Sequence, residues 1–288
     1  MFAIKQQICY PGNPSQPNED IVGFGKDYCF AMDGASCLSG VEVMDRGSDA
    51  AWLVEHVAAG LCQRLDAGDN RTTAELLLEI LLPLKVDYLS ALAEKGMEQP
   101  DDSPTAGFAL FRKRNGYLEF YGLGDCVGAA VLPGGENFYS LDTRLPQLDN
   151  AVLEKMSQLH QQTKLPLLQT RPMCNDLLLS NRKKRNQPDG YWVLDLDAPI
   201  ALERARQFRW ELTEPISVAA FSDGFAQLSE VFGLFDGYSA LFDAMQVSDL
   251  EQMYQQLFSA QDADPDCNQY PRFKLRDDTC ALWGVFTP

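Results

Sequence analysis

Acidic residues recur in this sequence at one end of short apolar runs, which are typical of buried strands. Four such positions are Asp33, Asp125, Asp223 and the pair Asp277–Asp278. A glycine follows both Asp33 and Asp223, where it allows a sharp backbone turn and exposes a carbonyl oxygen. If these strand ends converge, the carboxylates form a cluster of hard oxygen ligands, which suits Mg²⁺ or Mn²⁺ rather than zinc.

Composition limits the partners of such a site. The chain has 288 residues, enough for one large or two small domains, and 45% of them are hydrophobic, so a sizeable core is expected. The net charge of −17 argues against binding to nucleic acid or to an anionic membrane, because both need a basic face. Phosphate substrates remain compatible with this charge if metal ions neutralise the site.

The cysteines and the N-terminus point to a reducing compartment. None of the eight cysteines forms a Cys-x-x-Cys pair, and residues 1–7 do not have the pattern of a signal peptide. The most apolar stretch, 76–84, is interrupted by Glu79 and Pro83 and is too short to cross a bilayer. We therefore expect reduced thiols and a cytoplasmic location.

Periodicity predicts the elements that must position the acids. Helices are expected over 45–65 and from Thr72, whose spacing to Glu75 matches a capping box, toward Glu94. A tight turn is expected at Asn115-Gly116. Strands are expected at 2–9, 21–24, 28–32, 106–112, 117–123, 127–132, 191–196, 207–212, 216–221 and 280–286.

Residues 133–190 are the least regular part of the chain. They contain one expected helix, 150–162, and a basic run, 182–185. Further helices are expected at 199–206, 237–245 and 248–260. Because strands group at the start, middle and end with helices in pairs between them, the order favours an α+β sandwich over a parallel sheet.

Six short motifs follow one another along nearly the whole chain. They are Asn18-Glu19-Asp20, Phe30-Ala31-Met32-Asp33-Gly34, Ser103-Pro104-Thr105-Ala106, Gly124-Asp125, Phe221-Ser222-Asp223-Gly224 and Asp277-Asp278. In this order they resemble the metal-dependent type-2C (PPM) serine/threonine protein phosphatases, in their compact bacterial form. The resemblance implies a four-layer α-β-β-α sandwich of two antiparallel sheets flanked by helix pairs. It also implies one domain over 1–288, with a variable, flap-like insertion around 133–190.

The resemblance implies the activity as well. It predicts a phosphoserine/phosphothreonine protein phosphatase in which a hydroxide bridging two Mn²⁺ or Mg²⁺ ions attacks phosphorus, with a third ion as an option. The partner would be a phosphorylated protein, and the compact chain would work beside a separate serine/threonine kinase.

Individual roles follow from the resemblance position by position. Asp33 would bridge two metals, the Gly34 carbonyl would add a ligand, and Asp223 and Asp277 would hold one metal. Glu19 would act through a metal-bound water, and Asp125 would help Asp223 to hold a third metal. The outer-shell partners would be Asp20 and Asp278.

Three positions depart from the family pattern. Where the family often has a phosphate-gripping arginine, this sequence has Ser15. Where many members have a histidine after Asp-Gly, this sequence has Ala35, so no histidine can act as general acid there. The usual serine or threonine after the last acid pair is Cys280. The first departure puts phosphate affinity in doubt, but none removes a metal position.

The basic run has two interpretations. As the only basic cluster, it could be a solvated loop. Alternatively, it could lie beside the metals and contact the substrate phosphate in place of the missing arginine through Arg182, Lys183, Lys184 and Arg185.

Other functions remain open at this point. Single acids at strand ends can be simple turn formers. The chain could also be a catalytically weak regulatory or partner-binding module on the same fold, or a phosphatase of small metabolites. Asp195-Leu196-Asp197 is similar to the Asp-x-Asp of haloacid-dehalogenase phosphatases, but it lies far from the N-terminus and lacks the threonine that should follow. Nucleophilic serine or cysteine catalysis has little support, because the chain has only two histidines.

Overall fold

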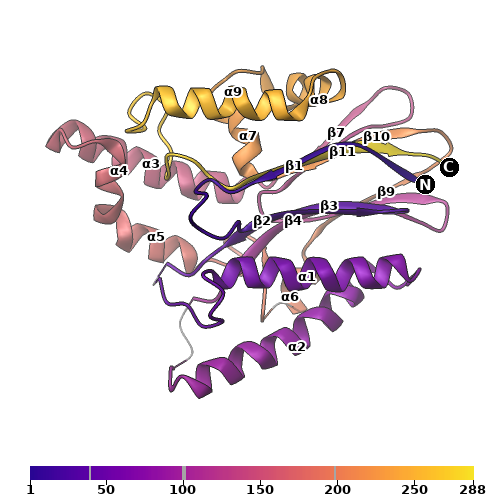
Figure 1. The fold of residues 1–288 in the computed structure, drawn as a ribbon, viewed down its shortest axis with the longest axis horizontal. Coiled ribbons are helices and arrows are strands. Elements are labelled where there is room, and N and C mark those ends of the chain that lie inside the picture. Colours follow the sequence, from indigo (N-terminus) through magenta and orange to yellow (C-terminus); the bar gives the residue numbers. More distant parts are fainter. Residues whose placement is uncertain (39, 99–101, 198) are drawn as a thin grey trace.

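The chain folds into two antiparallel sheets that pack face to face (Figure 1). A computed structural model describes residues 1–38, 40–98, 102–197 and 199–288. Sheet A has the strand order β1-β11-β10-β6-β7, and sheet B has the order β2-β3-β4-β5-β9, with the short β8 paired to β4. The α+β sandwich expected from the sequence is therefore confirmed.

The strands agree closely with the expected ranges. Sheet A consists of β1 Phe2–Tyr10, β6 Val127–Val131, β7 Asn137–Ser140, β10 Ile216–Phe221 and β11 Thr279–Phe286. Sheet B consists of β2 Asp20–Gly25, β3 Tyr28–Ala35, β4 Thr105–Arg114, β5 Tyr117–Leu123, β9 Arg206–Glu211 and β8 Leu194–Asp195. The expectation of a strand over 191–196 was mostly wrong, because only the two residues of β8 pair with β4.

Helices cover the outer face of each sheet and complete the four layers (Figure 1). Sheet B is covered by α1 Asp49–Asp66 and α2 Thr73–Glu94. Sheet A is covered by α7 Asp223–Glu230, α8 Gly237–Val247 and α9 Leu250–Ala263. The short α6, Pro199–Glu203, packs through Ala201 and Leu202 into the core beneath α1 and α2. This arrangement confirms the implied α-β-β-α sandwich.

The central strand β3 shows why its apolar run is continuous. Successive side chains of a strand point to opposite faces. Phe30 and Met32 pack into the core shared with α1 and α2, whereas Cys29 and Ala31 pack between the two sheets. Both faces of β3 are buried, so it has no polar side to interrupt the run before Asp33.

Local signals in the sequence set several element ends. Thr72 and Glu75 form the expected capping box at the start of α2. Asn115 and Gly116 have φ angles of 52° and 82°, the left-handed values that a tight β4–β5 turn requires. The polar loop that follows α2 contains residues 99–101, which lie outside the described residues.

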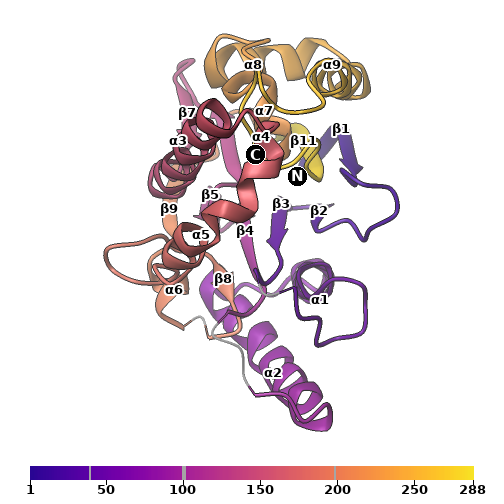
Figure 2. The same cartoon turned by 90° about the vertical axis from the view of Figure 1, so that its left-hand side faces the viewer.

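The segment 133–190 is more regular than its sequence indicated. It contains β7, α3 Arg144–Thr163, α4 Leu167–Thr170, the 3₁₀ helix η1 Arg171–Cys174 and α5 Asn175–Arg182. Only Val152 and Met156 of α3 are fully buried, so the helical period is weak in the sequence. The segment shares a small core with Cys267 and Phe273 from the chain after α9, and it lies at the end of the sandwich away from both termini (Figures 1 and 2).

Within the described residues, none of the helices combines the length and apolarity needed to span a bilayer. The cysteine side chains are all free thiols.

Candidate metal centre

Strand pairing brings the predicted acids to one end of the sandwich. Asp20 and Asp33 lie directly opposite each other on β2 and β3, so their side chains share a face of sheet B. In sheet A, Phe221 of β10 pairs with Ala281 of β11, which places Asp223 beside the acids that precede β11. Asp125 follows β5 at the same end. Residues about 250 positions apart in the sequence therefore meet, as the site requires.

The carboxylates at this end are close enough to repel one another. The carboxyl groups of Asp33 and Asp223 interact directly, and each shifts the pKa of the other. Burial, followed by the charges of Asp20, Asp223 and Asp125, raises the pKa of Asp33 well above its ordinary value. Burial, followed by the charges of Asp277 and Asp125, raises the pKa of Asp223 to about 7. Excess negative charge of this kind favours a bound cation.

Asp20 is the most deeply buried of these acids. It is 4% exposed, and its Oδ2 atom has no hydrogen-bond partner among the described residues. Burial, and then the charges of Asp223, Asp277 and Asp278, raise its pKa well above the ordinary value of an aspartate. A buried polar atom without a partner is uncommon in a folded protein. The Oδ2 atom is therefore a second sign that a positively charged group, or water bound to one, belongs at this end.

Gly34 and Glu19 form the next layer of the site. The Gly34 N–H donates to the Glu19 carbonyl oxygen at 2.9 Å, and a Cβ atom at position 34 would lie 2.7 Å from that oxygen. The Glu19 carboxylate accepts hydrogen bonds from Ser36 and, at 2.5 Å, from the Ser48 hydroxyl that also caps α1. The sequence interpretation missed both serines. The only local signal in the sequence was the position of Ser48 at the start of the helix expected over 45–65.

Asp278 ties the loop 11–19 to the start of β11. Its two carboxylate oxygens accept hydrogen bonds from the backbone N–H groups of Gly12 and Glu19, both at 2.7 Å. Asp278 therefore orients the backbone that carries Glu19. This placement is compatible with the predicted outer-shell role.

Asp223 begins a helix, which the sequence interpretation missed by expecting only a turn. It is the first residue of α7, where the helix N-terminus favours a negative charge. A Cβ atom at Gly224 would overlap the Asp278 carbonyl oxygen, so only glycine allows α7 to approach β11 this closely.

Asp125 belongs to a wider group that includes a residue the sequence did not single out. Burial, and then the charge of Asp149, raise the pKa of Asp125 to about 7. Asp149 comes from α3, and burial, followed by the charge of Asp223, raises its pKa to about 7. Arg206 of β9 donates to the Gly124 carbonyl oxygen at 2.9 Å and holds the turn before Asp125. No sequence pattern marks Asp149, because acids are common on helix surfaces.

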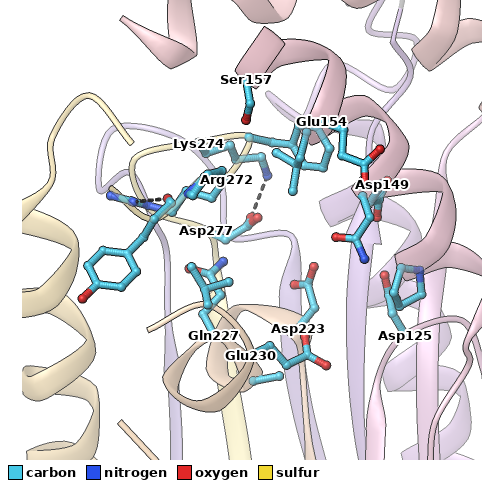
Figure 3. Close-up of a pocket in the computed structure, with 18 of the residues that line it drawn as sticks. Asp125, Asp149, Glu154, Ser157, Asp223, Gln227, Glu230, Arg272, Lys274 and Asp277 are labelled. Carbon is cyan, nitrogen blue, oxygen red and sulfur yellow. Dashed lines mark hydrogen bonds and ion pairs between the residues drawn. The ribbon is translucent and has the colours of Figure 1, made fainter. Parts of the chain in front are cut away.

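A cavity of about 1080 Å³ opens beside these acids (Figure 3). Its walls are α3, α7 and the segment 269–277, and Asp125, Asp149, Asp223 and Asp277 all line it. Lys274 extends from the last wall, and its Nζ lies 2.7 Å from Asp277 Oδ1 (Figure 3).

The basic run does not form a solvated loop. Arg182 donates to the Ser36 carbonyl oxygen at 2.6 Å, and Arg182 and Arg185 approach the Asp102 carboxylate at 3.1 and 3.0 Å. These buried ion pairs tie the end of α5 to the segment before β4, and they occupy the two guanidinium groups that the sequence offered as phosphate contacts. For Lys183 and Lys184 the phosphate contact stays a prediction.

The acids lie at the same end of the sandwich, but their side chains are not yet at the spacing of a metal-binding site. Among the residues that the structure describes, no group of three or more His, Cys, Asp or Glu side chains is compact enough to hold a metal ion by itself. The hard oxygen donors, the excess charge and the unpartnered Asp20 atom fit Mg²⁺ or Mn²⁺.

Comparison with known proteins places this geometry on a known fold. No protein-family model and no curated protein sequence matches the chain. Among solved structures, it is similar to the serine/threonine phosphatase PstP/Ppp of Mycobacterium tuberculosis, with a TM-score of 0.56 and 12% identity over 100% of both chains. It is also similar to PppA, a regulatory component of T6SS in Pseudomonas aeruginosa, with a TM-score of 0.56 and 14% identity over 99% and 96% of the two chains.

A further match is the catalytic domain of PstP in complex with two manganese ions, with a TM-score of 0.53 and 12% identity over 99% of this chain and 98% of that one. Identities at this level speak for architecture alone. The chain therefore has the fold of the bacterial serine/threonine phosphatases to which it is similar.

Proposed function

We propose that this chain is a Mn²⁺- or Mg²⁺-dependent phosphatase of phosphoserine and phosphothreonine in proteins. The observation that carries the proposal is the meeting of Asp33, Asp223 and Asp277, from three distant parts of the sequence, at one end of the sandwich beside an open cavity. The fold shared with bacterial phosphatases, one of them in complex with two manganese ions, supports it.

The proposed ligands are Asp33, the Gly34 carbonyl, Asp223 and Asp277. When bound, divalent cations lower the pKa of coordinated water from about 15.7 toward about 7 and neutralise phosphoryl oxygens. We assign Glu19 to a water of the centre, because Ser36 and Ser48 already fix one of its carboxylate oxygens.

Asp125 is the proposed ligand of a third metal, beside Asp149. Asp20 and Asp278 are the proposed outer-shell partners, since Asp20 is buried opposite Asp33 on the neighbouring strand and Asp278 holds the backbone of Glu19. Ala35 offers no general acid, so the leaving-group proton would come from water in the cavity.

We further propose a phosphorylated protein as substrate, a separate serine/threonine kinase as its counterpart and the cytoplasm as its compartment. The size of the cavity supports a peptide substrate, because about 1080 Å³ exceeds what a single phosphate needs. We also propose that residues 1–288 form one domain with 133–190 as its variable insertion, and the small core that joins this segment to Cys267 supports a single domain.

The test is hydrolysis of a phosphothreonine peptide with Mn²⁺. Asp33→Asn is expected to reduce kcat/KM by at least about a hundredfold, because it replaces the carboxylate proposed to be shared by two cations with a neutral amide, which is a weaker ligand. Unfolding by urea checks that the variant is folded. Glu98→Gln, an exposed acid outside the cavity, is the matched control and should retain full activity.

A binding module on the same fold is the second candidate, favoured by Ser15 and Ala35 at the two departing positions. Calorimetry separates the two functions, because the enzyme must bind two Mn²⁺ per chain whereas a scaffold need not. Absence of turnover with phosphopeptides and with small phosphorylated metabolites at saturating Mn²⁺ would contradict the proposed activity.

A further inference from the structure

The cavity lacks an obvious cation for the substrate phosphate. A phosphomonoester brings nearly two negative charges into a space already lined by acids. Ser15 is exposed and uncharged, and the guanidinium groups of Arg182 and Arg185 are paired with Asp102. Among the described residues that line the cavity, Arg272 and Lys274 are the cations.

Arg272 is committed to its own segment. It is 4% exposed, and its guanidinium donates to Asp264 Oδ2 at 2.9 Å and to the carbonyl oxygens of Gln261 and Leu275 at 3.2 and 3.1 Å. These contacts hold the segment after α9 in place. Moving the guanidinium toward a ligand would leave the buried Asp264 carboxylate without its cationic partner, which is costly.

Lys274 has the opposite character. Its side chain is 53% exposed, and its Nζ reaches into the cavity at Asp277, at 2.7 Å (Figure 3). An ammonium has three N–H donors, and in the described part of the chain only the bond to Asp277 is made. Its four-carbon stem allows the charge to shift by a few ångströms.

We propose that Lys274 binds the phosphate of the substrate and supplies the positive charge that is missing at position 15, where the residue is serine. The ammonium turns two donors toward the phosphoryl oxygens while it stays beside Asp277. Its position on the cavity side of the acids lets it meet the phosphate and offset the repulsion that the acids exert on it. This inference rests on the proposed function and adds to it the residue that recognises the substrate anion.

The test compares Lys274→Met with Lys274→Arg in the Mn²⁺-loaded protein. Two constants are measured: KM for a phosphothreonine peptide and the inhibition constant of inorganic phosphate. Lys274→Met is expected to raise both by about 10- to 100-fold, as loss of a charge-assisted hydrogen bond predicts, whereas Lys274→Arg stays within about threefold of the original protein. Lys155→Met, an exposed lysine on α3 outside the cavity lining, is the control and should change neither constant.

Calorimetric titration with Mn²⁺ alone separates phosphate binding from a purely structural ion pair. If Lys274 only neutralises Asp277, Lys274→Met will bind Mn²⁺ more tightly and leave both phosphate constants unchanged, and the inference is then wrong. Urea unfolding shows whether each variant is folded. If the methionine variant is not, Lys274→Gln takes its place, with the same expected rise in both constants. A parent protein that hydrolyses no phosphopeptide would overturn the proposed function together with this inference; an active parent with unchanged constants in Lys274→Met would overturn the inference alone.

Discussion

At the scale of residues, the carboxylates of the site repel one another when ionised, and a bound cation would reduce this repulsion. The pKa of Asp223 is raised from 3.8 to about 7. Because the folded-state value lies above the unfolded one, the stability linked to this group is complete below about pH 4 and is lost as the pH rises through about 7. The metal-free protein therefore carries a penalty at neutral pH that it does not carry in acid.

Asp223→Asn should remove this penalty. In the presence of a chelator, the variant is expected to be more stable than the original protein by about 1–3 kcal/mol near pH 8, and nearly equal to it near pH 4. Urea unfolding at the two pH values measures the difference. The control is Asp69→Asn, because its ion pair with Arg71 lowers the pKa of Asp69 and the expected change at pH 8 has the opposite sign. If the free energy of unfolding of the variant has the same pH dependence as that of the original protein, ionisation of Asp223 does not destabilise the fold.

At the scale of elements, α7 and β11 must approach closely for Asp223 and Asp277 to share a site. Gly224→Ala places a methyl group against the Asp278 carbonyl oxygen and should push α7 away from β11. We expect a loss of stability of about 1–3 kcal/mol and Mn²⁺ binding weakened at least about tenfold. Calorimetry with Mn²⁺ measures the second effect.

Gly96→Ala is the matched control for this substitution. Gly96 has a φ of 63° with open space around it, so the added methyl group costs backbone strain of about 1 kcal/mol without touching the site. Its Mn²⁺ affinity should be unchanged. Equal affinities in Gly224→Ala and Gly96→Ala would mean that the spacing of α7 and β11 does not set the centre.

Asp102 pairs with both guanidinium groups at the end of α5, and Arg185 also pairs with Asp195. Asp102 is 7% exposed and faces both Arg182 and Arg185, so Asp102→Asn leaves two buried guanidinium groups with less charge to pair with. The expected loss of stability is about 3–5 kcal/mol, with faster proteolysis between residues 171 and 190. Asp197→Asn breaks the exposed pair with Lys85 and should cost about 0.2–1 kcal/mol. Identical protease patterns for the two variants would contradict a clamp at Asp102.

At the scale of the whole molecule, the net charge of −17 attracts basic peptides and repels acidic ones. Asp149 and Glu154 on α3 extend the negative charge along the cavity wall (Figure 3). Phosphopeptides with lysine or arginine beside the phosphorylated residue should therefore show a higher kcat/KM than those with glutamate. The difference should shrink between about 0.05 M and about 0.5 M salt, since screening shortens the range of exposed charges. A preference that is independent of salt would point to direct contacts instead.

Much of this architecture could be predicted from local sequence. The continuous apolar run of β3, the capping box at Thr72 and the turn at Asn115-Gly116 act within a few residues, and each of these elements was predicted. The acids at the strand ends could also be identified, because antiparallel strands bring such ends together. The shared motif order pointed to the four-layer sandwich.

Other features were decided only by the tertiary structure. The helices α4, η1, α5 and α7 were missed, because each has at most eight residues and gives too short a helical period to recognise in the sequence. Lys274, Asp149, Ser36 and the pairing of Arg182 with Asp102 join segments far apart in the chain. Charged and hydroxyl side chains are ordinary on loops and helix surfaces, and they acquire a role only through the groups that folding brings beside them. The sequence by itself therefore determined the fold class and the positions of the acids, whereas tertiary packing decided which cations and hydrogen-bond donors surround them.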